Sequence, residues 1–258
     1  MTLTFAAAER AAAFVRAHGS ALDRARAAVL VGAGPVAGAL DALEAEGPAE
    51  GLFALQRALH VCDDLRALHA PLVERACAQL GATQAADGSW SDAAADPLCA
   101  TGMLAGYLAK TRYARAQTLQ SAADFLAARW SPDLVQGGQW RNIAAYAHLF
   151  ANFDHERSDE ILQWCGRELA RGYRTHAFDA VRTARILVTC DAHALPGAPL
   201  EPRELRDALL AEQAGDGSWR AAADAAPGAR IETTLDGLVA LARFGATPAG
   251  LAAAGRTG

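Results

Sequence analysis

The sequence predicts an all-α protein assembled from pairs of helices, and three observations support this. Hydrophobic residues make up 52% of the 258-residue chain, which is enough for a large buried core. Alanine, the best helix former, dominates that fraction, and β-branched residues are sparse. A short stretch also occurs twice, as QAADGSW at 84–90 and QAGDGSW at 213–219, each time between two helical patterns. Repetition of one element in a helical setting is typical of repeat folds.

The first third of the chain has no clear copy of this motif and is predicted to form three or four helices. Residues 6–18 make an amphipathic pattern with acidic and basic side chains, so we interpret them as a helix and not as a signal peptide. Helical patterns follow at 24–46 and 50–68.

From residue 71 onward the chain repeats one unit, in which an outer helix, a polar loop and a more apolar inner helix follow one another. Pro202 suits a first helical turn, Ser158 a cap, and Gly81 the position just after a helix. Weaker copies of the loop surround Trp140 and Tyr173. Outer helices are predicted at 71–81, 158–172 and 201–213, and inner helices at 97–110, 142–153, 178–190 and 231–245.

We expect five or six such pairs in a single domain over residues 1–245, with the repeat-bearing part at about 68–245. The Gly/Ala-rich residues 246–258 are expected to be a frayed tail.

The repeated motif is predicted to be a structural clasp. Its glutamine can bond to the start of the next helix, whose first N–H groups lack partners within the helix. Asp-Gly-Ser forms a tight turn, and the tryptophan packs its ring beneath that turn. We therefore expect Gln84, Trp90, Gln213 and Trp219 to hold the fold together and not to take part in chemistry.

The two motifs, each preceded by an amphipathic helix and followed by an apolar one, resemble the QW repeats of squalene–hopene cyclases and protein prenyltransferase β subunits. The resemblance covers roughly residues 68–245. It implies an (α/α) toroid, in which outer helices surround inner ones and the inner helices surround a central apolar cavity that holds an isoprenoid.

The cyclases of this family carry a proton-donating DxDD motif at the start of an inner helix, and this chain departs from it. Asp96 matches the first aspartate, but Leu98 and Cys99 stand where the later two would be. The pair Asp63 and Asp64 lies near the predicted end of another helix, and we interpret it as solvated surface.

The prenyltransferases hold zinc through Asp-x-Cys and a later histidine, and this pattern is also incomplete. Asp96 and Cys99 are separated by one residue too many, and the last inner helix has no histidine. Cys99, His148 and His176 would be the alternative three-ligand set. We expect no cofactor, and we interpret Cys99 as a buried structural cysteine.

Polar residues near the starts of inner helices are the remaining candidates for chemistry. His176, Asp179 and Arg182 are spaced by three and would be neighbours on one helix face, either as an acid/base group or as a structural cluster. Glu232 and Asp236 lie one turn apart, either as cavity acids or as partners of a helix N-terminus, and we favour the latter.

The candidate residues for binding a substrate are arginines and aromatic side chains. Arg141 suits a diphosphate or carboxylate, and aromatic faces stabilise cations, although Phe150 and its neighbours would also suit a packed core. The predicted catalytic residues are Asp96, His176, Asp179 and Glu232, and the predicted substrate-binding residues are Trp140, Arg141, Tyr146, Phe178 and Arg182.

These features predict a stand-alone terpene-cyclase-like enzyme that acts on an isoprenoid or other lipophilic, polyene-like substrate by acid/base-initiated cyclisation. A non-catalytic module that binds a hydrophobic ligand or a partner, and a prenyltransferase β-like subunit, are the alternatives. The net charge of −5 without a basic stripe argues against nucleic acid, and no run of ~20 uncharged apolar residues predicts a membrane span. The five scattered cysteines suit a reducing cytoplasm. A homodimer and a partner subunit stay open.

Overall fold

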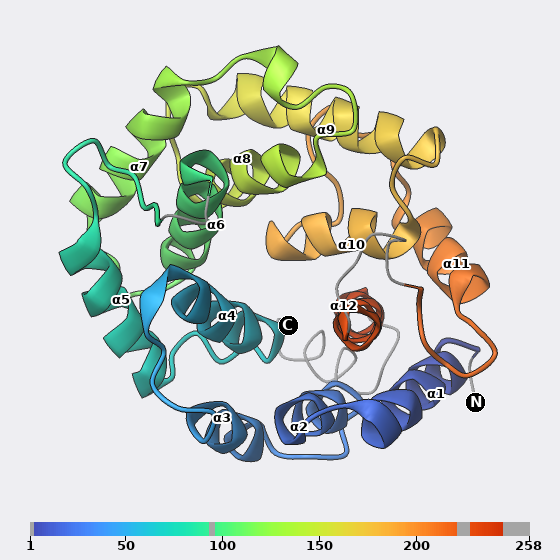
Figure 1. The fold of residues 1–258 in the computed structure, drawn as a ribbon. Coiled ribbons are helices and arrows are strands. Elements are labelled where there is room, and N and C mark those ends of the chain that lie inside the picture. Colours follow the sequence, from blue (N-terminus) through green and yellow to red (C-terminus); the bar gives the residue numbers. More distant parts are fainter. Residues whose placement is uncertain (1–2, 93–95, 221–227, 245–258) are drawn as a thin grey trace, which may run out of the picture. The chain divides into compact units, whose positions relative to one another are not determined.

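The structure, a computed structural model, describes residues 3–92, 96–220 and 228–244, and these residues form α-helices joined by short connections (Figure 1). Within these ranges the chain forms twelve α-helices and one 3-10 helix, with no strand, which confirms the predicted all-α class. The 3-10 helix η1 spans Pro132–Leu134.

The chain is divided into two compact units, each built from more than one stretch of sequence. Unit 1 comprises residues 1–48, 179–188 and 201–258, and unit 2 comprises residues 49–178 and 189–200. The prediction of a single domain over 1–245 remains a prediction, and the predicted tail at 246–258 lies outside the described residues.

Unit 1 holds the N-terminal helices together with the last helix of the chain. Helix α12 packs against both α1 and α2, and α2 packs against α3 (Figure 1). Ser20 begins α2 with a capping box that it forms with Asp23. The helices are α1 (Leu3–His18), α2 (Ala21–Leu30), α3 (Val36–Glu44), α10 (Ala180–Thr189, whose last residue belongs to unit 2), α11 (Pro202–Glu212) and α12 (Ala229–Arg243).

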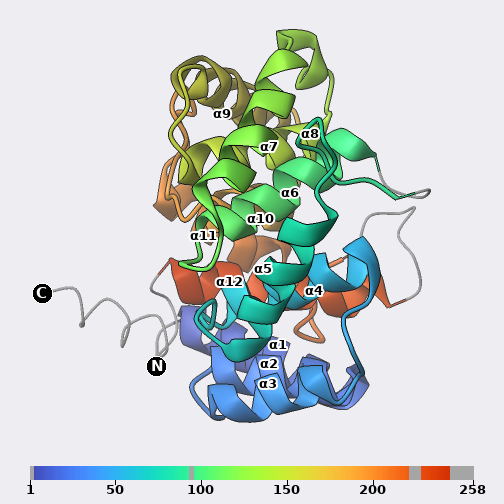
Figure 2. The same ribbon diagram turned by 90° about the vertical axis from the view of Figure 1, so that its left-hand side faces the viewer.

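Unit 2 is organised around α6 and α8, which lie side by side in Figures 1 and 2. Small residues permit this close approach: a Cβ on Gly102 would overlap the backbone of Ala145, and one on Gly106 would overlap the ring of His148. Helix α9 packs on the other side of α8. The helices are α4 (Gly51–Asp64), α5 (Pro71–Thr83), α6 (Pro97–Ala109), α7 (Ala116–Ala128), α8 (Trp140–Asn152) and α9 (Ser158–Arg174).

Most predicted helices are present, but some begin or end at other residues than predicted. Helix α5 does not end at Gly81 but continues to Thr83, whose hydroxyl donates to a carbonyl of its last turn. Ser158 is the first residue of α9 and not its cap, which is Arg157. Helix α7 was not predicted, because its sequence carries no motif.

The first motif forms the predicted clasp, with the glutamine acting as a donor. Gln84 Nε2 donates to the carbonyl oxygen of Gly88, at 2.9 Å, and to that of Thr118 in the first turn of α7, at 3.0 Å. Trp90 Nε1 donates to the carbonyl oxygen of Leu80 on α5, at 2.9 Å. The glutamine was predicted to bond to unpaired N–H groups at the start of the next helix, but it instead donates to carbonyl oxygens of its own turn and of α7.

The second motif forms the same bonds, and its glutamine binds the N-terminal helix α1. Gln213 Nε2 donates to the carbonyl oxygens of Gly217, at 2.8 Å, and of Ala7 on α1, at 2.9 Å. Trp219 Nε1 donates to the carbonyl oxygen of Leu209, at 2.9 Å. Both tryptophans are 1% exposed, so truncating either ring would cost about 3–5 kcal/mol of stability. Helix α1 thus occupies, for the second clasp, the position that α7 occupies for the first.

The glycine of each clasp predicts a sharp contrast between two substitutions. Gly88 has φ 87°, and a Cβ there would overlap the carbonyl oxygen of Ser121, whereas Gly81 lies in α5 with nothing within 4 Å of an added Cβ. We expect Gly88→Ala to cost about 2–4 kcal/mol, from strain and overlap together. The matched control Gly81→Ala should stabilise the chain by about 0.5–1 kcal/mol, as measured by urea unfolding. Equal effects of the two changes would contradict this account of the clasp.

The aspartate of each clasp predicts a dependence of stability on pH. Bonds from the Ser89 hydroxyl and backbone N–H lower the pKa of Asp87 below its usual value of 3.8, and Ser218 does the same for Asp216. A folded-state pKa below the unfolded one means that the stabilisation is complete above the unfolded value and is lost as pH falls through the folded value. Urea unfolding across that acid range should therefore show a smaller loss of stability for Asp87→Asn combined with Asp216→Asn than for the wild type. The exposed control Asp41→Asn should follow the wild type, and an unchanged acid profile of the double variant would refute the role of these carboxylates.

Candidate functional site

Two of the predicted catalytic carboxyls begin helices. Asp96 is the N-cap of α6, and its side chain accepts a hydrogen bond from the backbone N–H of Leu98, at 3.1 Å. Asp179 stands just before α10, and its Oδ1 accepts from the backbone N–H of Arg182, at 2.7 Å. Caps of this kind stabilise a helix start, which accounts for both residues without chemistry.

The prediction that His176, Asp179 and Arg182 share a helix face is wrong. Helix α10 begins at Ala180, so only Arg182 of the three lies within it. His176 is exposed in the connection from α9 and has a left-handed backbone, with φ 58°. Residues three apart are neighbours on one face only within a continuous helix, and the backbone here is not helical between His176 and Asp179.

Two of the predicted substrate-binding aromatic residues belong to the packed core. The Tyr146 ring meets Trp130 edge-on at 4.8 Å, its hydroxyl donates to the carbonyl oxygen of Leu126, and burial raises the pKa of its phenol. Phe178 packs against Gly172 of α9, where a Cβ would overlap its ring.

Two further residues predicted to bind substrate lie at the beginning of α8. Trp140 is the first residue of α8, and the exposed guanidinium of Arg141 lies over its ring, 5.3 Å from the ring centroid. A substrate-binding role for these residues stays a prediction.

The alternative zinc ligands are not gathered into one site within the described part of the chain. The Cys99 thiol donates to Asn142 Oδ1 on α8, at 3.4 Å, and desolvation, with Asp96 as a smaller cause, raises the pKa of this thiol to about 12. His148 is buried instead against Tyr107, with the ring centroids 4.4 Å apart.

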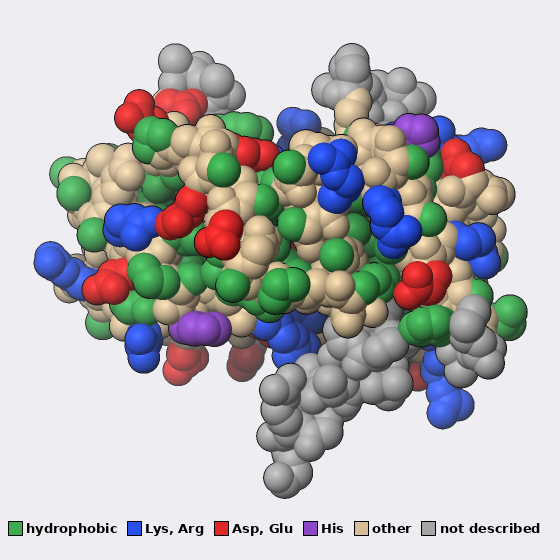
Figure 3. All heavy atoms as spheres, turned by 90° about the horizontal axis from the view of Figure 1, so that it is seen from below, with side chains coloured by type: hydrophobic (Ala, Val, Ile, Leu, Met, Phe, Trp, Pro, Cys, Tyr) green, Lys and Arg blue, Asp and Glu red, His purple; other side chains and the backbone are tan. Residues whose placement is uncertain are grey.

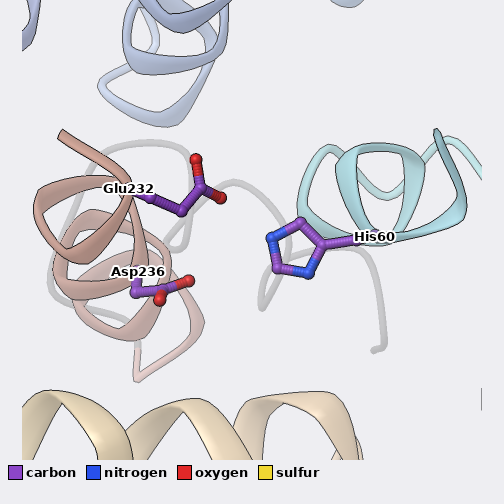
Figure 4. A group of neighbouring side chains, drawn as sticks. All are labelled: His60, Glu232 and Asp236. Carbon is purple, nitrogen blue, oxygen red and sulfur yellow. The ribbon is translucent and has the colours of Figure 1, made fainter. Parts of the chain in front are cut away.

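The predicted acid Glu232 forms an ion pair with a buried arginine of the same unit. It lies in the first turn of α12, where the favoured interpretation placed it, and both of its oxygens accept from Arg26, at 3.0 and 3.1 Å. Figure 4 shows Glu232 and Asp236 one turn apart on the same side of α12. Asp236 pairs with Arg185 of α10, at 3.5 Å. Both carboxyls are thus engaged by guanidinium groups of the same unit, as is usual for charge-assisted pairs.

His60, the third side chain in Figure 4, belongs to unit 2, where it forms a group that we call the histidine relay: His60, Asp64 and Tyr107. His60 and Asp64 lie four residues apart on α4, with Nε2 3.4 Å from Asp64 Oδ2. His60 Nδ1 lies 3.0 Å from the hydroxyl of Tyr107 on α6. The His60 side chain is 22% exposed, whereas Asp64 and Tyr107 are buried, so the imidazole is the member that solvent or a ligand reaches.

Next to the relay lies a second group, the lysine centre: Lys110, Asp63 and Asp191. Lys110 is the only lysine in the sequence, and its Nζ lies 2.6 Å from Asp63 Oδ1 and 2.9 Å from Asp191 Oδ2. It also donates to the carbonyl oxygen of Thr189, at 3.2 Å. The interpretation of Asp63 and Asp64 as solvated surface is therefore wrong, since both are buried, at 2% and 3% exposure. The end of α4 is buried within unit 2, where Asp63 pairs with Lys110 and Asp64 lies beside His60.

The histidine relay is the arrangement in unit 2 that is suited to proton transfer. The tyrosine hydroxyl orients the imidazole through Nδ1, and the carboxylate stabilises the imidazolium that forms when Nε2 takes up a proton. Two sequence signals point to these groups: a histidine four residues before an aspartate, and two acids at a helix C-terminus, where the macrodipole disfavours them.

Comparison with protein-family models, with curated proteins and with solved structures returned no match for this chain. Within the described ranges, no helix combines the length and apolarity that crossing a bilayer would require. On the face drawn in Figure 3, positive and negative side chains are interspersed among apolar and neutral ones.

The ion pair between Arg26 and Glu232 predicts unequal effects of its two partners. Arg26 is 1% exposed, whereas Glu232 is 47% exposed. Glu232→Gln leaves a buried cation without its bidentate partner and should cost about 2–5 kcal/mol, reduced by the nearby Asp23. Arg26→Met leaves a carboxylate that water can solvate, so we expect it to cost less in urea unfolding. A larger cost for Arg26→Met would contradict this.

Proposed function

We propose that this chain is a terpene-cyclase-like enzyme, built as an (α/α) toroid, that acts on an isoprenoid or other lipophilic, polyene-like substrate by acid/base cyclisation. The observation that carries the chemical part of the proposal is the histidine relay, a partly exposed imidazole between a buried carboxylate and a buried phenol. The fold part is supported by the two clasps.

The clasps support a toroid because each ties its loop to a following outer helix. The first reaches Thr118 on α7, and the second reaches Ala7 on α1. In an open row of repeats, the last loop would need a further helix after it. The use of α1 in that place is what a closed ring of helix pairs requires.

The relay supports cyclisation because such a reaction both uses and releases a proton. An acid adds a proton to an alkene or epoxide of the substrate, ring closure moves the positive charge along the carbon chain, and a base removes a proton to form the product alkene. His60 can act as that base through Nε2, while its Nδ1 is hydrogen-bonded with the Tyr107 hydroxyl. Asp64 then stabilises the imidazolium. Asp96, in the same unit as His60, is the candidate for the initiating acid of this reaction, and Asp179 and Glu232 are the predicted acids of unit 1.

A second function, the binding of a lipophilic ligand without reaction, is favoured by the state of those three carboxyls. Asp96 and Asp179 accept backbone bonds as caps, and Glu232 pairs with Arg26. Each of them would have to give up an accepted hydrogen bond before it could donate a proton to a substrate. Native mass spectrometry separates the two functions, because a carrier would retain an intact lipid that an enzyme would convert. In either case the proposal requires no cofactor.

We expect the purified chain to convert a linear isoprenoid into a cyclic product. The experiment incubates the protein with linear isoprenoids of increasing length, with and without a terminal epoxide or diphosphate, and detects products by gas chromatography with mass spectrometry. His60→Ala should reduce the turnover by about 100- to 10,000-fold, because it removes the acid/base group. Asp64→Asn should reduce it less, because the imidazole remains.

The control is His69→Ala, which changes an exposed histidine in the connection after α4. It should retain the wild-type turnover. Full turnover by a folded His60→Ala variant would remove the relay from the mechanism, and bound but unconverted lipid in the wild type would favour the carrier.

A further inference from the structure

The lysine centre neutralises an unfavourable arrangement of charges at the end of α4. Asp63 and Asp64 are the last two residues of this helix. The C-terminal end of a helix carries negative partial charge, so two adjacent carboxylates are disfavoured there. Both are also buried, and a buried carboxylate costs several kcal/mol unless it is paired. A local rule broken in this way marks a functional or strained position.

One ammonium group meets the ends of three helices at this point. Lys110 is the C-cap of α6, Asp63 ends α4, and Thr189 is the last residue of α10. Asp191 follows two residues later, with a left-handed φ of 51°. A cation is favourable at each of these ends, because the terminal carbonyls of a helix point toward it. The surroundings exclude water: desolvation raises the pKa of the buried Cys190 thiol to about 12, with Lys110 acting in the opposite direction.

The geometry of the centre explains why it uses lysine in a chain that otherwise uses arginine. An ammonium group has three N–H donors on one atom, and three acceptors surround this one: Asp63 Oδ1 at 2.6 Å, Asp191 Oδ2 at 2.9 Å and the Thr189 carbonyl at 3.2 Å. A guanidinium spreads its five donors over a planar fork and cannot direct three of them from one point. The only lysine of the sequence therefore stands where the acceptors demand a point charge.

We infer that Lys110 is a positioning residue for the histidine relay: by holding Asp63, it fixes the end of α4 and thereby keeps Asp64 beside His60. Asp63 and Asp64 are consecutive, so a displacement of one carries the other with it. Tyr107, which orients His60 through Nδ1, lies three residues before Lys110 on α6. The same lysine thus sets the spacing between the two helices that supply the relay. Its importance for turnover rests on the proposed function, whereas its effect on His60 does not.

The first test uses the fact that the chain has a single lysine. Acetylation of the folded protein with an amine-reactive ester, followed by peptide mass spectrometry, reports on Lys110 Nζ alone among the side chains. We expect acetylation at least about 100-fold slower than in urea, because the group is covered and fully bonded. Asp191→Asn, which weakens one of the three bonds at a half-exposed residue, should accelerate it. Equal rates in the folded and unfolded wild type, or no acceleration in Asp191→Asn, would overturn the inference.

The second test compares Lys110→Arg and Lys110→Met with Arg115→Met, which removes a positive charge from an exposed residue of the same unit. In folded variants, as judged by circular dichroism, both Lys110 changes should shift the ring-nitrogen NMR signals of His60, and arginine should not restore them. Turnover should fall mainly in kcat, since the imidazole and not the substrate site is displaced. Arg115→Met should change neither quantity.

Unchanged His60 signals in a folded Lys110→Arg variant would overturn the inference. If neither Lys110 variant folds, the acetylation test on the wild type and on Asp191→Asn decides it. Neither the NMR nor the acetylation readout uses a substrate. A chain without turnover would therefore contradict the proposed function and leave the inference decidable.

Discussion

The fold depends on one constraint that occurs twice: the loop of each clasp buries polar groups beside the helix that precedes it, and two side chains satisfy them. The indole of the tryptophan donates to the last turn of the preceding helix, and the glutamine amide donates to the turn and to a neighbouring helix. Because unpaired buried carbonyls are costly, these bonds are as important as the apolar burial of the ring. The clasp thereby joins three segments at one point.

The same constraint governs the charged groups, and each unit meets it differently. In unit 1, the buried Arg26 is balanced by Glu232, which remains half exposed and keeps part of its hydration. In unit 2, the carboxylates at the end of α4 are buried and depend on Lys110 and His60. In the half-exposed pair, water can still hydrate the glutamate. In the buried centre, water cannot replace a missing partner, so every donor and acceptor has to be matched within the protein. That difference explains why the more specific geometry occurs in unit 2.

The chemistry that we propose lies where carboxylates, an imidazole and a phenol converge, and not where the family resemblance directed attention. The start of α6, where the resemblance to cyclases implied an acid motif, holds Asp96 as a helix cap and Cys99 as a thiol whose pKa is raised by burial. The position of a residue in the repeat therefore indicates where it lies in the fold, whereas its chemical role has to be inferred from the groups that it contacts. His60 has such partners on both ring nitrogens.

Local pattern by itself determined the all-α class, the apolar helices around Leu104 and Leu238, and the role of Trp90 and Trp219, because these follow from periodicity and from a motif whose bonds are mostly short in sequence. Only the tertiary structure decided that α1 serves the second clasp, that Glu232 faces Arg26, and that Asp63 and Asp64 are buried beside Lys110 and His60. Some of these contacts join residues that are distant in sequence. The others involve a helix end that the local sequence would lead one to expect in solvent. The physical reason is that a side chain's partners, unlike its helical propensity, depend on which segments pack together.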